Sequence, residues 1–465
     1  MRTIKLERAP ERFTYWLNER PVYVRGTSYM PALYLSQVDA PALAHDLALA
    51  RDANLNLLRL HVHVSPPEVY DLCDRAGMLV WQDFELNWVQ DASPEFETRA
   101  LEMQRGMIDL LGNHPSIITG RATTSRRWCS PAAPTWNATP TRRSTPTPAP
   151  TTRRARSFCV PGNWKMTWRS GDTHSYYGAI WSRHYADAYR HHPRLVTEFG
   201  FEAPAALDTL RAYPDTWERL QHLDGVIDAL WAYQAALIQY HVEHFRRLRI
   251  ESCGGYVHFW LTDLVPQVGC GVLDSCRVPK GGYAALKRSS QPLLPMLEHD
   301  GRKPLALWVA NDTPRAYPGA VIRWCVTGKR GVLAAGDCIY DVAANAVGRV
   351  MPVSWGFPPA DAVRVTLRLE DADGSLLSEN EYAAPFQPAE RPRGYPWKFD
   401  PYLGTKVFDR PGAPSLADHG ISPVLRLVPL ALRESVTERV LRQRLPTAVV
   451  SRIGRVVDGL MGNNR

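Results

Sequence analysis

The order of apolar strands and amphipathic helices constrains the fold of this chain most strongly. Leu55–Leu60 is an apolar run of the kind that forms a buried strand, and Leu195–Glu198 opens with the apolar pair Leu195-Val196. Helical patterns at 40–53 and 96–111 lie between the predicted strands. Strands that are apolar on both faces are typical of a parallel sheet covered by helices on each side. The strand–helix repeats number near eight, so we predict an α/β fold, a closed (β/α)8 TIM barrel rather than an open doubly wound sheet.

The pattern changes after about Pro295, where short strands follow one another without helices between them. These predicted strands are Leu305–Ala310, Ala320–Val326, Val350–Trp355 and Ala362–Leu369. Such an arrangement indicates a small antiparallel β-sandwich. The predicted organisation is therefore a barrel at 1–298, a sandwich at 299–400 and a C-terminal extension at 401–465 to which we assign no fold. A chain of 465 residues is long enough for this division.

A carboxylate stands at the end of one predicted barrel strand, in Thr197-Glu198-Phe199-Gly200. TIM barrels place their chemistry at the C-terminal ends of the strands, which makes Glu198 a candidate catalytic residue. Taken alone the pattern is weak, because a glutamate in this position is often only part of a salt bridge. Its weight comes from the motifs on either side of it.

Several motifs occur in the order and at the spacing of one known family. They are LNERPVYVRGTSYMP at 17–31, NLLRLHVH at 56–63, YDLCDRAGMLVWQDF at 70–84, LGNHPSI at 111–117, GDTHSYYG at 171–178, HPRLVTEFGF at 192–201 and GYVHFWLTDLVPQVGCGVLDSCRVPKGGYAALK at 255–287. Across about 17–290 the chain resembles glycoside hydrolase family 2, the β-galactosidase, β-glucuronidase and β-mannosidase group. The resemblance implies a catalytic barrel followed by an immunoglobulin-like domain. It also leads us to expect that the family's N-terminal sugar-binding domain is lacking.

The resemblance assigns roles to particular residues. Retaining glycosidases need two carboxyls about 5–5.5 Å apart, and Glu198 matches the family's nucleophile, with Arg59 as the arginine that keeps it ionised. The remaining residues expected to line the sugar site are His63, Asp83, His174, Tyr176 and Trp260. The sequence favours His63 over His61, because it stands nearer the C-terminal end of its strand. Structural alternatives stay open: an ion pair for Arg59, a turn cap for Asp83, and core packing for Tyr176 and Trp260.

The chain departs from the family pattern after LGNHPSI. The family continues with a strand, a Trp and an Asn-Glu pair that supplies the acid/base, whereas here the sequence reads Thr119-Gly120-Arg121-Ala122 and no Asn-Glu follows. The stretch up to Arg156 contains no Val, Ile, Leu, Tyr or Phe and is rich in Thr, Pro and Arg. Such a composition does not supply a buried face. We expect residues 120–157 to be either disordered or translated out of frame.

A frameshift explains this segment in terms of codons. The residues from Gly120 to Trp128 can be encoded GGG CGT GCC ACA ACG AGC CGG CGA TGG. With a preceding T and a shifted frame, the same bases read Trp-Ala-Cys-His-Asn-Glu-Pro-Ala-Met, which restores the Asn-Glu pair. We hypothesise a frameshift near residue 120 and a compensating one near Cys159, either as a true mutation or as a sequencing error.

The charge of the chain is concentrated in the same segment. The net charge is +8, and residues 120–156 hold eight Arg and no acid. The rest of the chain is therefore balanced, which argues against nucleic acid as a partner, although an Arg-rich segment that binds acidic partners is a weaker alternative. No signal peptide or apolar run of membrane-spanning length is present, and the eight Cys show no metal-site spacing. We expect a cytoplasmic protein with no membrane contact, no metal and no cofactor; homo-oligomer formation stays open.

The favoured function is a retaining β-glycosidase that acts on a carbohydrate substrate of the β-galactoside, β-glucuronide or β-mannoside type. The alternative is a catalytically impaired pseudoenzyme that binds a glycan without cleaving it, because the acid/base Glu is missing from the sequence as written. The motif VWQDF leans toward the mannosidases, and HVH leans away from them. The sequence therefore leaves the sugar undecided.

Overall fold

The computed structural model describes most of the chain up to residue 408. The described residues are 3–9, 12–86, 93–121, 172–179, 185–301, 303–353, 355, 363–384, 396–400 and 405–408. The chain divides into two compact units, Met1–Val407 and Phe408–Arg465, and the account below concerns the first. Most of the 120–157 segment and of the 401–465 extension lies outside the described residues.

Seven parallel strands form one sheet in the order β7-β6-β5-β4-β11-β9-β8. They are β4 (Val24–Tyr29), β5 (Leu57–Leu60), β6 (Leu79–Asp83), β7 (Ile117–Arg121), β8 (Asp172–His174), β9 (Leu195–Phe199) and β11 (Gly255–His258). The first of these strands, β4, pairs in parallel with the last, β11. Strands that follow one another in the chain are parallel neighbours on each side of this pair, which is the strand order of a TIM barrel.

The two ends of this sheet flank the segment in which the sequence departs from the family pattern. β7 and β8 each have one neighbour in the sheet, and residues 122–171 lie between them in the chain. Among the residues that the structure describes, no strand joins β7 to β8. The predicted barrel fold is confirmed, with seven of its strands among the described residues.

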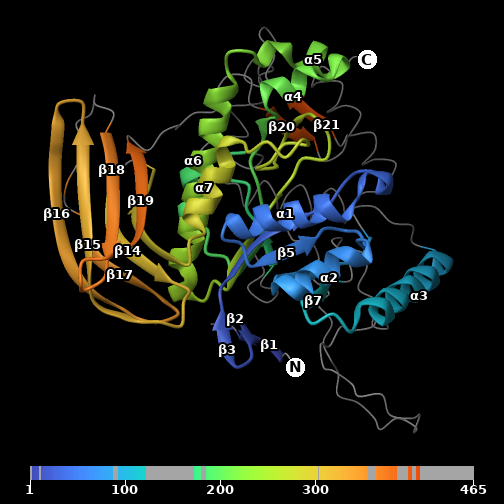
Figure 1. The fold of residues 1–465 in the computed structure, drawn as a ribbon, viewed down its shortest axis with the longest axis horizontal. Helices are drawn as coiled ribbons and strands as arrows, with labels where there is room; N and C mark the ends of the chain where they lie inside the picture. The colour runs from blue at the N-terminus through green and yellow to red at the C-terminus, as the bar shows by residue number, and fades with distance from the viewer. Residues whose placement is uncertain are drawn as a thin grey trace, which may run out of the picture. The chain divides into compact units, whose positions relative to one another are not determined.

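Helices cover the outside of the sheet, and local sequence signals fix their ends. The main ones are α1 (Ala40–Asp52), α2 (Pro67–Ala76), α3 (Pro94–Leu111), α6 (Ile227–Arg247) and α7 (Gly281–Ser289), with the shorter α4 (Leu207–Arg211) and α5 (Pro214–Leu220) (Figure 1). Asp39 and Ser93 accept hydrogen bonds from the first turns of α1 and α3, and Gly77 ends α2 with φ of 69°. No helix in the described ranges is both long and apolar enough to cross a membrane.

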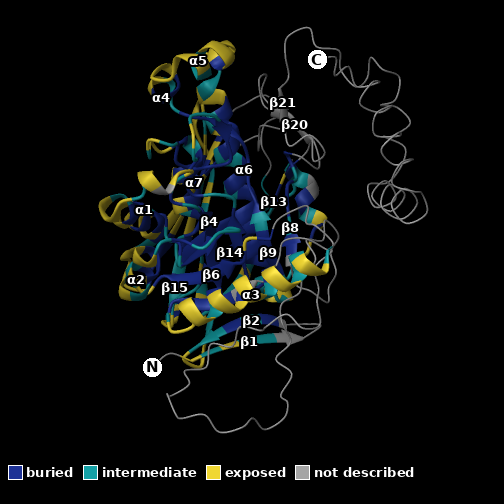
Figure 2. Ribbon diagram, turned by 90° about the vertical axis from the view of Figure 1, so that its right-hand side faces the viewer, coloured by how far each residue is buried: buried dark blue, intermediate teal, exposed yellow. Residues whose placement is uncertain are grey.

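The inside of the sheet is apolar toward the N-terminal ends of its strands. Val24, Leu57, Leu79, Trp81 and Val257 form one buried cluster with neighbouring strand residues. Strands β4, β6 and β9 are accordingly buried, whereas α3 presents an exposed outer face (Figure 2). Polar strand-end residues therefore gather at the opposite, C-terminal edge of the sheet.

A three-stranded antiparallel sheet at the N-terminus, which the sequence patterns do not predict, completes this apolar cluster. It consists of β1 (Ile4–Ala9), β2 (Arg12–Leu17) and β3 (Arg20–Val22). Phe13 and Tyr15 of β2 are 2% and 0% exposed and pack against the strand residues of the cluster. The Tyr15 hydroxyl lies 2.9 Å from Thr119 Oγ1, so this three-stranded sheet also contacts the end strand β7.

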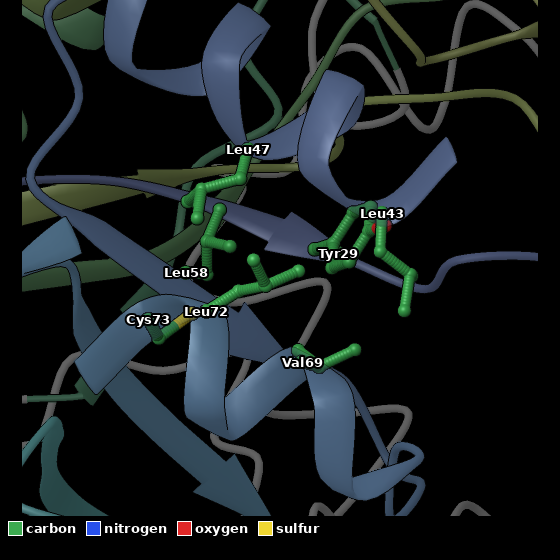
Figure 3. A pocket seen from close by; sticks show the side chains of 7 residues that line it. All are labelled: Tyr29, Leu43, Leu47, Leu58, Val69, Leu72 and Cys73. Carbon is green, nitrogen blue, oxygen red and sulfur yellow. The ribbon is translucent and has the colours of Figure 1, made fainter. Parts of the chain in front are cut away.

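A small apolar void lies between helices α1 and α2 and the strands beneath them (Figure 3). It measures about 10 Å³, roughly what one water molecule requires. Its lining residues are Tyr29, Leu43, Leu47, Leu58, Val69, Leu72 and Cys73. A void of this size and character belongs to the packing of helices on the sheet and has no role in substrate binding.

Two antiparallel sheets follow the barrel, as predicted. One contains β13 (Leu293–His299), β14 (Pro304–Asn311) and β17 (Ala346–Pro352), and the other contains β16 (Gly331–Val342), β15 (Tyr317–Gly328), β18 (Val363–Glu370) and β19 (Leu376–Ala384). Both sheets contribute to one apolar core that includes Leu307, Ile322 and Leu367. The strands β13, β16 and β19 were not among those expected from the sequence.

A buried carboxylate, Asp312, fastens the end of β14 to the barrel. It accepts hydrogen bonds from Arg25 (2.6 Å), Arg246 (3.0 Å) and Arg249 (2.8 Å), and its side chain is 3% exposed. Burial opposes ionisation of Asp312, but the charges of Arg246, Arg25 and Arg249 outweigh this effect and hold its pKa below the ordinary value.

We expect Asp312→Ala to lower the free energy of unfolding by about 3–5 kcal/mol, because it leaves buried guanidinium groups without their carboxylate. Urea unfolding checks this, with Asp224→Ala as control: Asp224 pairs with Arg211 on the surface and its loss should cost less than about 1 kcal/mol. Since the pKa of Asp312 is lowered by folding, its contribution is present above the ordinary aspartate pKa and is lost as the pH falls below it. Equal losses for both variants would contradict the prediction.

Candidate active site

Glu198 lies at the C-terminal end of β9, where the register between β9 and β11 is irregular. Tyr176 donates a hydrogen bond to Oε1 at 2.6 Å, and Arg59 donates one to Oε2 at 3.3 Å. His174 Nδ1 lies 3.6 Å from Oε1. The side chain is 13% exposed, so the carboxylate is largely enclosed but still open to a ligand.

The surroundings of Glu198 keep it ionised. Burial raises its pKa, but the charges of His174, His61 and Arg59 and the hydrogen bond from Tyr176 lower the pKa to about 2. Glu198 is therefore a carboxylate at neutral pH. A carboxylate acting as a nucleophile must be in this form, whereas a general acid must be protonated.

Arg59 connects three strands beneath Glu198. Its guanidinium donates to Asp83 Oδ2 through Nε (2.8 Å) and to the carbonyl of Thr197 through Nη1 (2.9 Å), and its side chain is fully buried. Its Cζ lies 5.8 Å from the centre of a Trp81 ring. Through these hydrogen bonds Arg59 connects β5, β6 and β9 and fixes the position and orientation of the Glu198 carboxylate.

Asp83 is turned toward protein groups. Its Oδ2 is held by Arg59, its Oδ1 accepts a hydrogen bond from Trp81 Nε1 at 2.9 Å, and its side chain is 1% exposed. Both oxygens thus have partners in the protein, and the hydroxyl-binding role expected from the sequence stays a prediction. The arrangement makes Asp83 the partner that orients Arg59.

Of the two histidines that follow β5, His61 rather than His63 lies against the carboxylates, and the expected sugar contact of His63 stays a prediction. His61 Nδ1 lies 3.5 Å from Asp83 Oδ2, and its charge contributes to the low pKa of Glu198. His63 instead bonds within its own loop, to Ser65 Oγ at 2.7 Å and to the His61 carbonyl at 3.1 Å. The physical reason is Val62, whose φ of 51° turns the chain so that the strand alternation ends at His61.

The GDTHSYYG motif lies beside β9, as the resemblance implies. The Ser175 amide donates to the Glu198 carbonyl at 2.8 Å, which places His174 and Tyr176 on either side of that bond. Burial and the charge of Glu198 raise the pKa of Tyr176 well above its ordinary value. Tyr176 therefore stays protonated and donates its hydrogen bond to the carboxylate throughout the pH range of a folded protein.

We expect Tyr176→Phe to raise the pKa of Glu198. A hydrogen bond to a charged group is worth about 1.5–3 kcal/mol, which corresponds to roughly one to two pH units. Reactions that need the carboxylate should then lose rate as the pH falls through about 3–4, whereas the wild type should keep its rate. The measurement is the rate of covalent labelling of Glu198 against pH, with the folded fraction followed by circular dichroism. Superimposable profiles would refute the prediction.

Two aromatic residues follow β11 at the same edge of the sheet. Phe259 and Trp260 stack with their ring centres 4.8 Å apart, and Phe259 also makes an edge contact with His61 at 5.2 Å. Phe259 thus links Trp260 to the histidine that faces the carboxylates. Trp260 is half-buried, and its role as a platform for the sugar stays a prediction.

The expected second carboxyl has no counterpart in the sequence between β7 and β8. A retaining mechanism needs its second carboxyl about 5–5.5 Å from the nucleophile. The family supplies that carboxyl just after the strand that is β7 here, but no Asp or Glu occurs from Arg121 to Gly171. The described residues therefore contain the carboxylate of Glu198 with its partners, and the run between β7 and β8 contains no acidic residue.

Glu198 is thus a strand-end carboxylate inside a parallel barrel, held ionised by His174, His61, Arg59 and Tyr176, at the edge where barrel enzymes place their chemistry. Residues 11–292 match the sequence model of the glycosyl hydrolases family 2 TIM barrel domain. This match covers more than half of the chain, which belongs to glycoside hydrolase family 2.

Individual relatives are glycosidases, and this chain matches only part of the length of each. β-Mannosidase from Bos taurus is 30% identical over 128 residues, which are 25% of this chain and 15% of that protein. Exo-β-D-glucosaminidase from Streptomyces avermitilis is 23% identical over 427 residues, 79% of this chain and 46% of that protein. The crystal structure of β-D-mannosidase from Dictyoglomus thermophilum superposes with a TM-score of 0.66 at 19% identity, covering 84% of this chain and 54% of that one. The chain thus spans about half of that structure, and the likeness concerns the fold.

Proposed function

We propose that this chain is a retaining β-glycosidase with Glu198 as its nucleophile. The observation that carries the proposal is the geometry of Glu198, a largely enclosed carboxylate at a barrel strand end whose two oxygens accept hydrogen bonds from Arg59 and Tyr176. Its pKa is accordingly low, at about 2. A group with so low a pKa is a poor general acid, so attack on an anomeric carbon is the role that suits it. The substrate class follows from the relatives named above, and terminal β-mannosides and β-glucosaminides are the first to test.

In the first half-reaction a carboxylate oxygen of Glu198 forms a bond to the anomeric carbon while the bond from that carbon to the leaving oxygen breaks. The leaving group departs with the electron pair and takes a proton from an acid or from solvent. In the second half-reaction water attacks the same carbon, the bond to Glu198 breaks, and the proton of the water passes to a base. Arg59 and Tyr176 hold the two oxygens of Glu198 in place through both steps.

The chain as written lacks the residue that transfers these protons. General acid–base catalysis contributes typically about 10²–10⁴-fold, so natural glycosides, whose leaving groups need a proton, should react slowly. A glycoside with an acidic leaving group avoids this need in the first step but not in the second. We therefore expect the glycosyl-enzyme at Glu198 to accumulate.

A glycan-binding pseudoenzyme is the second candidate. One observation favours it, namely the run from Arg121 to Gly171 without any carboxylate. On this alternative the barrel retains a sugar and turns none over. The ionised nucleophile would then serve only as a hydrogen-bond acceptor for a hydroxyl.

The two candidates are separated by incubating the protein with a panel of 2,4-dinitrophenyl 2-deoxy-2-fluoro β-glycosides and measuring the intact mass. Retaining chemistry gives a mass gain of one fluorosugar, which peptide mapping should locate to the segment of Leu195–Gly200. The sugar that reacts identifies the specificity. A protein that shows a cooperative melt, binds sugar and yet gains no mass with any member of the panel would favour the pseudoenzyme.

A further inference from the structure

A buried ion pair lies in the loop that follows β11. Lys280 Nζ is 2.6 Å from Asp263 Oδ2, and both side chains are fully buried. The same ammonium donates to the carbonyls of Ala203 (2.8 Å) and Gly269 (3.0 Å). Each of its three protons therefore has an acceptor.

These contacts join the segment after the nucleophile to the segment after Trp260. β10 (Ala203–Pro204), which follows β9, pairs with β12 (Val268–Gly269), which follows β11. Lys280 bonds to a carbonyl from each of these two short strands. One side chain thus connects the loops that carry the two halves of the described site.

The second oxygen of Asp263 faces Trp260. Asp263 Oδ1 accepts a hydrogen bond from the Gly271 amide at 2.9 Å and a longer one from Trp260 Nε1 at 3.4 Å. The Val268-Gly269-Cys270-Gly271 stretch makes room for this carboxylate: a Cβ on Gly269 would lie 2.1 Å from Oδ1, and one on Gly271 would lie 2.7 Å from it. Both glycines are therefore needed for the carboxylate to reach its position.

We propose that Asp263 and Lys280 act together as a positioning unit that fixes the indole of Trp260 relative to Glu198. A buried ion pair contributes little net stability compared with apolar residues of the same size, so stability alone gives no reason for these bonds. Its bonds to both loops and to the indole give it a geometric task instead. The effect on sugar binding rests on the proposed function, in which Trp260 is the platform for the sugar. The effect on the orientation of Trp260 is independent of that function.

The test is a spectrum of Trp260 in protein labelled with 5-fluorotryptophan. The ¹⁹F resonance of Trp260 is identified by its loss in Trp260→Phe. In the double variant D263N/K280M, which removes both charges at once, we expect this resonance to move by more than its linewidth while the other tryptophans keep theirs. D263N alone keeps an acceptor oxygen and the shape of the side chain, so it should fold and give a smaller shift in the same resonance.

The matched control is D46N/R277M. Arg277 belongs to the same loop and pairs with the buried Asp46 at 2.8 Å, but neither residue forms a hydrogen bond with Trp260 in the part of the chain that the structure describes. We expect the Trp260 resonance to stay in place in this control. An unmoved resonance in the two Asp263 variants overturns the proposal, and so does an equal movement in the control, because that would indicate general loosening of the loop.

Labelling kinetics give the functional readout. In D263N/K280M the fluorosugar concentration for half-maximal labelling should rise by about tenfold, while the limiting rate constant should change by less than about threefold, because a misplaced platform weakens sugar binding before and during reaction alike. A fall confined to the limiting rate constant would contradict a role through Trp260. If the wild-type protein forms no adduct, the proposed function fails, and the ¹⁹F spectra still decide whether the ion pair orients Trp260.

Discussion

Replacing Glu198 with Gln should abolish covalent labelling by fluoroglycosides and lower the rate with any activated β-glycoside by more than about 10⁴-fold. The amide keeps the size of the side chain and hydrogen-bonding atoms for Arg59 and Tyr176, but it has no anionic oxygen to attack the anomeric carbon. The expected loss is therefore chemical, and the melting curve of the variant should remain cooperative. The measurement is intact mass together with initial rates.

The control for this prediction is the same substitution four residues further on. Glu202→Gln changes a buried glutamate that directly follows the same motif, and it should leave the mass gain in place. Labelling that persists in Glu198→Gln would show that another group is the nucleophile. Labelling that disappears in both variants would trace the loss to the folding of this segment.

Restoring the reading frame across codons 120–157 should raise the rate with natural β-glycosides by about 10²–10⁴-fold, the usual contribution of a general acid–base group. The shifted frame supplies the Asn-Glu pair after β7, on the side of the site that faces Glu198 in a closed barrel. The gain should be small with dinitrophenyl glycosides, because their leaving group needs no proton. The ratio of the two rates is the quantity to measure.

Two comparisons make this prediction decisive. A frame-restored protein that carries Gln in place of the new Glu should regain the fold but not the rate. Resequencing the gene gives an independent check, since a segment with no length difference from an intact relative would remove the frameshift hypothesis. A restored protein that hydrolyses natural glycosides no faster than the chain as written would leave the pseudoenzyme as the better description.

The barrel was predictable because its strands are buried on both faces. For that reason Leu57–Leu60 is mostly apolar and β9 begins with the apolar pair Leu195-Val196. The resemblance supplied the order of the motifs. The three-stranded N-terminal sheet was missed although β1 begins with the apolar–charged alternation of a half-buried strand. The burial of Phe13 and Tyr15 depends on contacts with barrel strands that are distant in the sequence. β16 was missed because most of its residues are exposed, although Cys338, Tyr340 and Val342 at alternate positions pack against the sandwich core.

The site was predictable where a motif fixed it and not where tertiary contacts decide. Glu198, Arg59 and Tyr176 meet as the resemblance implies. The approach of His61, rather than His63, to Asp83 depends on the positive φ of Val62. A valine in a sequence gives no signal of a positive φ. Other features arise from contacts between residues far apart in the sequence, such as the engagement of Asp83 with Arg59 and of Lys280 with three separate segments.

The pairing of the first barrel strand with the last has a consequence for synthesis on the ribosome. Thr27 of β4 and His258 of β11 are bonded partners 231 residues apart in sequence. At a translation rate of 5–20 residues per second, β4 waits roughly ten to fifty seconds for its neighbour. During that time one edge of β4 is unpaired, and unpaired edges recruit other chains. The yield of soluble protein should therefore depend on translation speed and on chaperones that shield nascent chains.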